Sequence, residues 1–133
     1  MADTLELEVA TPERELVREL VTEVQLPGTK GYLGILPGHA PLVGLMGIGI
    51  LTYTVGSEKR YLAVHEGFVE IADDHVRVVA EAAERAEEID IPRAKNALER
   101  AIEEGQNPAE AVDPASALAA VARAQARIEA AEK

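Results

Sequence analysis

The chain has 133 residues and a mass of 14.2 kDa, the size of one domain or of a small domain with an appendage. Its 13 basic and 24 acidic residues give a net charge of −11, which repels nucleic acid and anionic membranes unless the few cations are gathered in one place. The absence of cysteine excludes disulfides, thiolate nucleophiles and zinc–thiolate sites. No stretch approaches the ~20 apolar residues of a membrane span, and the first residues lack the features of a secretion signal, so we expect a soluble, cytosolic protein.

Residues 1–82 have the pattern of short β-strands. Leu5, Leu7 and Val9 alternate with other residues, as in a half-buried strand. Further strands are expected at 16–26, 48–55, 59–64, 67–72 and 75–80, the last two joined by a turn at Asp73-Asp74. Many short strands with one polar face each predict an antiparallel β-sandwich or flattened barrel.

The composition changes at Glu81, after which the chain is rich in alanine, glutamate and arginine. Asp90 with Pro92, and Asp113 with Pro114, are helix-start signals, and a break begins at Gly105. The sequence therefore predicts two short helices that form an antiparallel hairpin. The expected apolar faces are Ala94, Leu98, Ala101 and Ile102 on the first helix and Leu118, Val121 and Ile128 on the second. Such a thin apolar surface predicts a hairpin that needs support from the sandwich and can leave it at modest cost.

The segment 27–49 is unusual for a loop because it is both rich in glycine and proline and strongly apolar. Its apolar residues either plug the end of the barrel or present a docking surface, and both can hold for different residues.

Several kinds of chemistry are missing from the sequence. There is no phosphate-binding glycine loop, and Ser57 and Ser116 are not in a nucleophile elbow. His39, His65 and His75 do not pair at metal-ligand spacing, and the segment 73–75 is more typical of a hairpin turn than of a metal corner. We therefore expect neither an enzyme nor a metal site.

The run Gly31-Tyr-Leu-Gly-Ile-Leu-Pro-Gly-His-Ala-Pro-Leu42 closely resembles a signature of the epsilon subunit of bacterial and chloroplast F-type ATP synthases. Thr11-Pro12 and the segments 61–70 and 82–94 match the same family in order, so the resemblance covers essentially the whole chain. It implies a β-sandwich of about ten strands followed by a two-helix hairpin, which we divide at 1–84 and 85–133.

The resemblance also implies a function. Members are non-catalytic rotor subunits of the central stalk that couple proton-driven rotation of the c ring to ATP synthesis. Their implied partners are the gamma subunit, the c ring and, through the hairpin, the alpha/beta catalytic head, where an extended hairpin inhibits ATP hydrolysis. The implied location is the cytoplasmic face of the bacterial plasma membrane or, alternatively, the stromal side of the thylakoid. A free-standing nucleotide sensor is the rival hypothesis, and a small hydrolase lacks any recognisable nucleophile.

The family's contact loop to the c ring or gamma falls on part of the apolar segment. Many members have glutamate where this chain has Tyr32, which argues against a charged contact there. Each of these residues has a purely structural turn as its alternative. The matching positions are Thr29, Lys30, Gly31, Tyr32, Leu33 and His39.

Some members bind ATP as a regulatory ligand in the compact hairpin, and no cofactor is otherwise required. The matching positions are Glu84, Asp90, Arg93, Ala94, Arg100, Arg123 and Arg127, whereas Ser116 stands where the family has one further arginine. The spacing alone allows a similar site, because each helix carries two of the four arginines on one face, and antiparallel packing would let them converge on a polyphosphate. In the alternative interpretation, Arg93 and Arg100 pair with Asp90, Glu99 or Glu103, and the other two arginines are solvated.

Overall fold

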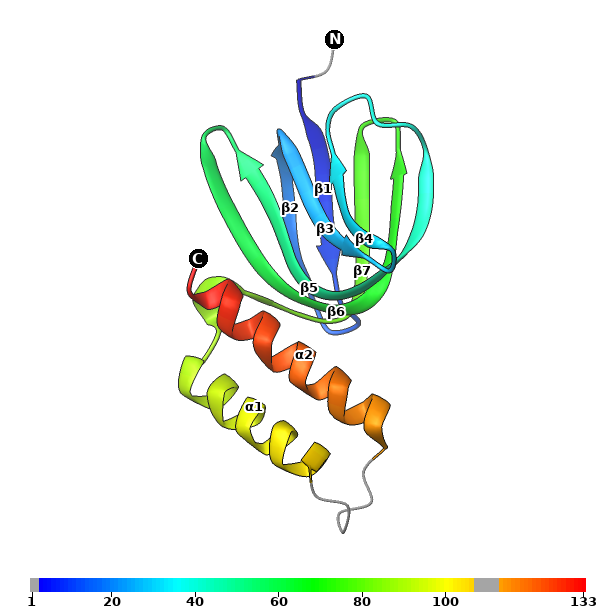
Figure 1. Ribbon diagram of the computed structural model, residues 1–133. Helices are drawn as coiled ribbons and strands as arrows, with labels where there is room; N and C mark the ends of the chain where they lie inside the picture. Colours follow the sequence, from blue (N-terminus) through cyan, green and yellow to red (C-terminus); the bar gives the residue numbers. More distant parts are fainter. Residues whose placement is uncertain (1–2, 107–112) are drawn as a thin grey trace.

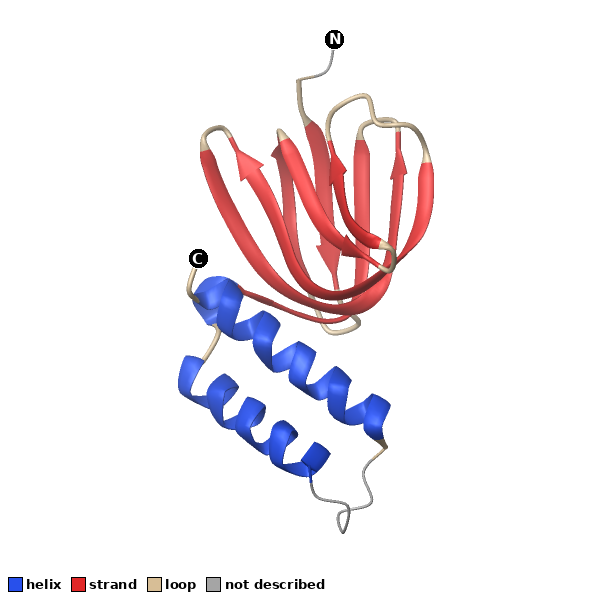
Figure 2. Ribbon diagram, in the orientation of Figure 1, coloured by secondary structure: helices blue, strands red, loops and turns tan. Residues whose placement is uncertain are grey.

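A β-sandwich is followed by two helices, the second of which packs against the outer side of the sandwich (Figures 1 and 2). The computed structural model describes residues 3–106 and 113–133. The strands are β1 (Leu5–Ala10), β2 (Glu15–Val21), β3 (Glu23–Gly28), β4 (Gly31–Ile35), β5 (Leu42–Val55), β6 (Glu58–Ala72) and β7 (His75–Arg85). A short 3-10 helix, η1 (Ala86–Glu88), precedes α1 (Ile91–Gln106) and α2 (Pro114–Ala131).

The strands form one sheet that folds over on itself in the order β2-β1-β7-β6-β5-β3-β4. The strongly curved β5 and β6, of 14 and 15 residues, run through both layers. The expectation of about ten strands is corrected to seven in the described residues, because the segments 59–64 and 67–72 are one strand that continues through Glu66. The sheet is also not entirely antiparallel, since β1 pairs with β7 in parallel.

Two further expectations are corrected. The predicted strand 16–26 is two strands, β2 and β3, which separate at Thr22. The predicted loop 27–49 contains all of β4 and the first half of β5. Its apolar residues divide between the two proposed roles, because Ile35 and Met46 are buried whereas Val43 and Leu45 are exposed.

The sandwich core is almost entirely aliphatic and follows the alternation of the strands. Val9 of β1, for example, is fully buried among residues that come from both layers of the sheet. The largest fully buried side chains are Leu5, Leu7, Leu26, Ile35, Met46, Leu51, Leu62 and Ile71.

The two helices begin where the sequence predicts. The Asp90 carboxylate accepts a hydrogen bond from the Arg93 N–H at 3.1 Å, and Pro114 occupies the first turn of α2. The predicted break starting at Gly105 lies largely outside the described residues. No helix in the described part of the chain is long and apolar enough to cross a membrane.

The buried faces of the helices match the prediction only in part: Ala94 and Ala101 are buried as expected. Leu118 and Ile102 are exposed, and the residues that pack are alanines. Small side chains let α2 approach both α1 and the sheet closely, so that α2 lies between them (Figure 1). The buried helix residues are Ala94, Ala101, Ala117, Ala124, Ala126 and Ala130.

Candidate functional site

A polar cavity of about 730 Å³ lies where the end of β7 meets the two helices, and we call it the hairpin cavity. Glu84 comes from β7, Arg93 and Arg100 from α1, and Arg127 from α2. The fold thus brings six of the seven predicted nucleotide positions to one cavity. Those six are Glu84, Asp90, Arg93, Ala94, Arg100 and Arg127.

The seventh position, Arg123, does not line the cavity but lies one helical turn before Arg127. Arg127 is not simply solvated, because its Nε donates to the Glu84 carboxylate at 2.7 Å. The alternative interpretation required ion pairs of Arg93 and Arg100 with Asp90, Glu99 or Glu103. Among the described residues, neither arginine forms such a pair.

Glu88 is a cavity residue that the sequence analysis missed. Its carboxylate accepts hydrogen bonds from Arg14 of the β1–β2 connection and from Arg85. The hydrogen bond from Arg14, and then its positive charge, hold the pKa of Glu88 below its usual range. No local motif reveals this contact, because Arg14 is distant in the sequence.

The joint between the helices and the sheet is a small apolar cluster beside the hairpin cavity. Ala126 and Ala130 of α2 pack against Ile50 of β5 and Ala63 of β6, with Ile89 closing the cluster. The ion pair between Arg127 and Glu84 joins the same two units. Because most of the side chains are small, the apolar area buried by docking is modest.

His65 of β6 is the one buried polar residue among those described, with 6% of its surface exposed. It lies two residues after Ala63, on the side of β6 that faces α2. Burial, and then the positive charges of Arg127 and Arg123, lower the pKa of His65 from 6.5 to about 4. The sequence analysis considered His65 only as a metal ligand.

The predicted contact loop is divided between two ends of β4. Thr29 and Lys30 form the tight turn between β3 and β4, and Gly31 follows with φ +120. His39 lies beyond the other end of β4, so the structure does not bring it next to that turn.

Tyr32 is 64% exposed but has a defined position. Its hydroxyl oxygen accepts a hydrogen bond from the backbone N–H of Ile50 at 3.0 Å. A side chain at Gly49 would collide with this hydroxyl, so the glycine makes room for the tyrosine. Leu33 is half-buried and packs against the sandwich core.

His39 is part of the open end of the sandwich, which we define as the connection 36–41 and the β6–β7 turn at 73–74. The open end lies away from the helices (Figure 1). Gly38 has φ +84, and its N–H donates to the Asp74 carboxylate at 2.6 Å. The predicted turn at 73–74 is confirmed, with both aspartates at positive φ. No group of residues suited to a metal ion is found in the described chain.

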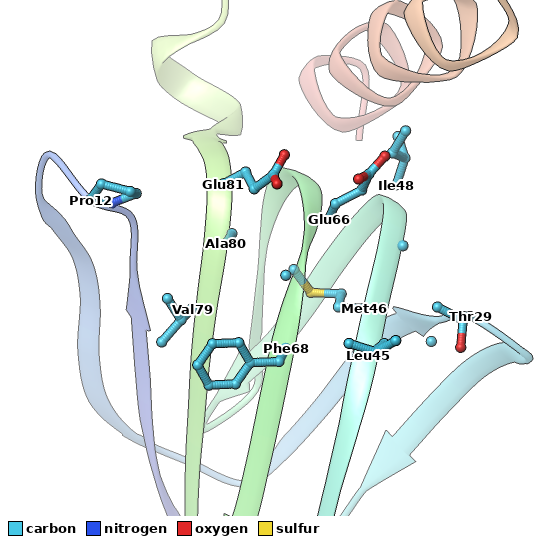
Figure 3. Close-up of a pocket in the computed structure, with 13 residues that line it drawn as sticks. Pro12, Thr29, Leu45, Met46, Ile48, Glu66, Phe68, Val79, Ala80 and Glu81 are labelled. Atoms are coloured by element: carbon cyan, nitrogen blue, oxygen red, sulfur yellow. The ribbon is translucent and has the colours of Figure 1, made fainter. Parts of the chain in front are cut away.

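A second cavity, of about 800 Å³, lies on the outer face of β5, β6 and β7, and we call it the outer-face cavity (Figure 3). Met46, Phe68 and Val79 form its apolar floor, and Thr29 stands at one side. Leu45 lies at its edge and is 68% exposed. Exposed apolar side chains around an apolar hollow are typical of a protein-docking surface.

Comparisons with known proteins agree with this architecture. Residues 4–86 match the family model "ATP synthase, Delta/Epsilon chain, beta-sandwich domain", and residues 87–132 match the corresponding "long alpha-helix domain". The chain belongs to the ATP synthase delta/epsilon chain family, and it is a non-catalytic subunit of that type. The epsilon chain of Solibacter usitatus is 69% identical over 133 residues, covering 100% of this chain and 99% of that one. The epsilon chain of Koribacter versatilis is 52% identical over 101 residues, covering 76% of this chain and 71% of that one.

A solved structure is similar over the whole chain. The structure of Euglena gracilis mitochondrial ATP synthase with OSCP, F1 and the c ring contains a chain with 27% identity and a TM-score of 0.85, covering 100% of this chain and 84% of that one. A chain of the Tetrahymena thermophila mitochondrial ATP synthase, with 15% identity and a TM-score of 0.54, shares the fold over 63% of this chain and 68% of that one.

Proposed function

We propose that this chain is an epsilon-type rotor subunit of the central stalk, which couples rotation of the c ring to ATP synthesis. The observation that carries the proposal is the separation of three surfaces on one small fold. The outer-face cavity is apolar, the open end is an edge of turns tied by the Gly38–Asp74 hydrogen bond, and the helices occupy a different side. A subunit that joins several partners in a rotor needs such separate surfaces.

We assign the outer-face cavity to the gamma subunit and the open end, with His39, to the c ring. Thr29 lies beside the outer-face cavity, so the β3–β4 turn belongs to the gamma surface in this proposal. The solved Euglena assembly, which contains F1 and the c ring, supports a position between these parts. The chain is then peripheral to the membrane, at the cytoplasmic face of the bacterial plasma membrane.

A matched pair of leucines tests the gamma surface. Leu45→Glu places a charge at the edge of the outer-face cavity, and Leu20→Glu places the same charge at an equally exposed leucine of β2. We expect Leu45→Glu to abolish co-purification with gamma and ATP-driven proton pumping, and Leu20→Glu to preserve both. Equal binding of gamma by the two variants would contradict the assignment, and no binding by the unaltered chain would favour a free-standing nucleotide sensor.

We further propose that the helices, residues 85–133, are a regulatory unit that restrains ATP hydrolysis when they extend toward the alpha/beta head. The small joint between α2 and the sheet supports this, because a few kcal/mol suffice to shift such an equilibrium. Deletion of residues 85–133 should leave coupling intact and raise the hydrolysis rate of the assembled enzyme. An unchanged hydrolysis rate would remove the regulatory role and leave the coupling role standing.

The hairpin cavity is the proposed site for ATP as a regulatory ligand. The cavity is lined by Arg93, Arg100 and Arg127 together with the carboxylates of Glu84, Glu88 and Asp90. The three guanidiniums are the groups that would hold a polyphosphate. Calorimetric titration with Mg-ATP tests this, with Arg93→Ala against Lys95→Ala, an exposed cation of α1 outside the cavity. We expect only Arg93→Ala to lose binding. Absence of binding at millimolar ATP would assign the arginines to protein contacts instead.

A further inference from the structure

The side chain of His65 is enclosed where α2 meets the sheet. Its register partners, Ile48 on β5 and Ala82 on β7, are uncharged. Its Nε2 atom is buried and has no hydrogen-bond partner among the residues that the structure describes. A neutral imidazole tolerates this environment, whereas an imidazolium would carry a buried N–H and a full charge without a partner.

The charges that face His65 come from two elements. Arg123 and Arg127 act on it from α2, and Glu84 acts on it from β7. Glu84 is already bound by Arg127 at 2.7 Å, so its charge is largely satisfied by that arginine. An imidazolium at this position would therefore be repelled by α2 in addition to being desolvated.

We propose that His65 is a proton-operated release for the helical hairpin: protonation of its imidazole drives α2 off the sandwich. The sandwich keeps its own core, which does not include His65. In the described residues, the contacts that oppose the departure are the small apolar joint and the Arg127–Glu84 pair. In the released state the ring is hydrated and two arginines move away from it.

The direction and size of the pH effect on docking follow from the linkage between protonation of His65 and release of the hairpin. In the docked chain the pKa of His65 is lowered from 6.5 to about 4 by burial and by the arginines of α2. In the released state, without α2, we take the ring at its ordinary pKa of 6.5, so the released state binds the proton more strongly. The docked state is therefore favoured above pH 6.5, and its stability relative to the released state falls as the pH falls toward 4. Between pH 7 and pH 5 the ratio of released to docked chains should rise about 20-fold.

The inference rests on the proposed function in one respect, namely that departure of the hairpin is the regulatory event. The docking equilibrium itself belongs to the isolated chain and can be measured without gamma or the c ring. The experiment can therefore fail while the Leu45→Glu test of the rotor function succeeds, or the reverse.

The absence of cysteine from the chain permits a direct test by thiol protection. Ala126→Cys places a thiol in the buried joint, and Gln125→Cys places one on the exposed side of the same helix. The reaction rate of the buried thiol with dithiodipyridine, divided by that of the exposed thiol at the same pH, reports the released fraction. The division removes the effect of pH on the thiol itself.

We expect this rate ratio to rise about 20-fold from pH 7 to pH 5 in the chain that keeps His65. His65→Gln should show a flat ratio, and His75→Gln, an altered histidine far from the joint, should keep the full rise. A constant ratio in the unaltered background, or an equal rise in His65→Gln, would overturn the proposal. NMR titration of the His65 ring in the unmutated chain is the second measurement. A pKa of 6.5 for this ring in the docked state would also overturn the proposal.

Discussion

The carboxylate of Asp74 accepts a hydrogen bond of 2.6 Å from the backbone N–H of Gly38, and this contact ties the 36–41 connection to the β6–β7 turn. The carbonyl of Asp74 also accepts a hydrogen bond from the Glu6 N–H at 2.9 Å, so the same residue ties the open end to β1. The shape of the open end therefore depends on the Asp74 side chain, which lies outside the family signature at 31–42.

This arrangement predicts that Asp74→Ala loosens the 36–41 connection. The free energy of unfolding should fall by about 1–2 kcal/mol more than in Asp73→Ala, because a hydrogen bond to a charged group is lost. Asp73 is the matched control, since both residues have positive φ and share the strain of the substitution. Urea denaturation measures the difference, and hydrogen exchange of the Gly38 amide should quicken only in Asp74→Ala. Equal effects of the two substitutions would contradict the role of Asp74.

Two glycines of the sandwich should respond differently to alanine. A Cβ at Gly67 would lie 2.0 Å from the Val79 carbonyl oxygen, whereas a Cβ at Gly34 would meet nothing within 4 Å. Gly67→Ala must push β6 and β7 apart, and we expect a loss of about 3 kcal/mol or more in the free energy of unfolding. Gly34→Ala should change it by less than about 0.5 kcal/mol. Chemical denaturation checks both, and a stable Gly67→Ala would show that the strands can separate there at little cost.

A double-mutant cycle on Arg127 and Glu84 should isolate their contribution to docking. The pair is about one-third exposed, so we expect a coupling free energy of about 0.5–1 kcal/mol, not the larger value of a buried pair. Arg127→Met, Glu84→Gln and the double variant are compared by the protection of the thiol in Ala126→Cys. Strictly additive effects would mean that the two side chains meet without stabilising the docked hairpin.

The acid dependence of overall stability should follow the same histidine. The pKa of His65 is lowered in the folded chain, so the unfolded chain binds the proton more strongly and stability falls as the pH drops through the range from 6.5 to about 4. From pH 7 to pH 5 we expect the unaltered chain to lose about 1–2 kcal/mol more of its unfolding free energy than His65→Gln loses. Urea titrations at the two pH values measure this loss. Parallel losses in both chains would assign the acid sensitivity to other groups.

Most of the fold is predictable from local patterns. The alternation of Leu5, Leu7 and Val9 correctly identifies β1, and the aspartate–proline signals correctly locate the start of both helices. Boundaries inside the sheet are less visible, because Glu66 has a positive φ yet the strand continues past it. The predicted helix faces were right for Ala94 and Ala101 but wrong for Leu118, because side-chain size suggested burial whereas close packing in the structure selects alanine.

The residues of the candidate site are likewise predictable from the sequence only in part. The arginine spacing predicts that four arginines converge, and three of them, Arg93, Arg100 and Arg127, line one cavity, whereas Arg123 does not. The residues that the sequence does not reveal, His65 and Glu88, depend on contacts between segments far apart in the chain. Nothing local to His65 indicates that a helix about fifty residues later covers it, so its environment follows only from the packing of α2.

The parallel pairing of β1 with β7 has a consequence for synthesis of the chain on the ribosome. β1 is made first, but it gains its second neighbour only when β7, the last strand, has been translated. A nascent chain that stops before residue 75 leaves β1 and β6 without this neighbour, and such an open sheet edge is prone to aggregation and degradation. A chain that stops just after residue 85 already contains every strand of the described sheet. Translation therefore completes the proposed coupling surfaces before the proposed regulatory helices are made. Truncation after the last strand would yield a rotor subunit that assembles but does not restrain ATP hydrolysis.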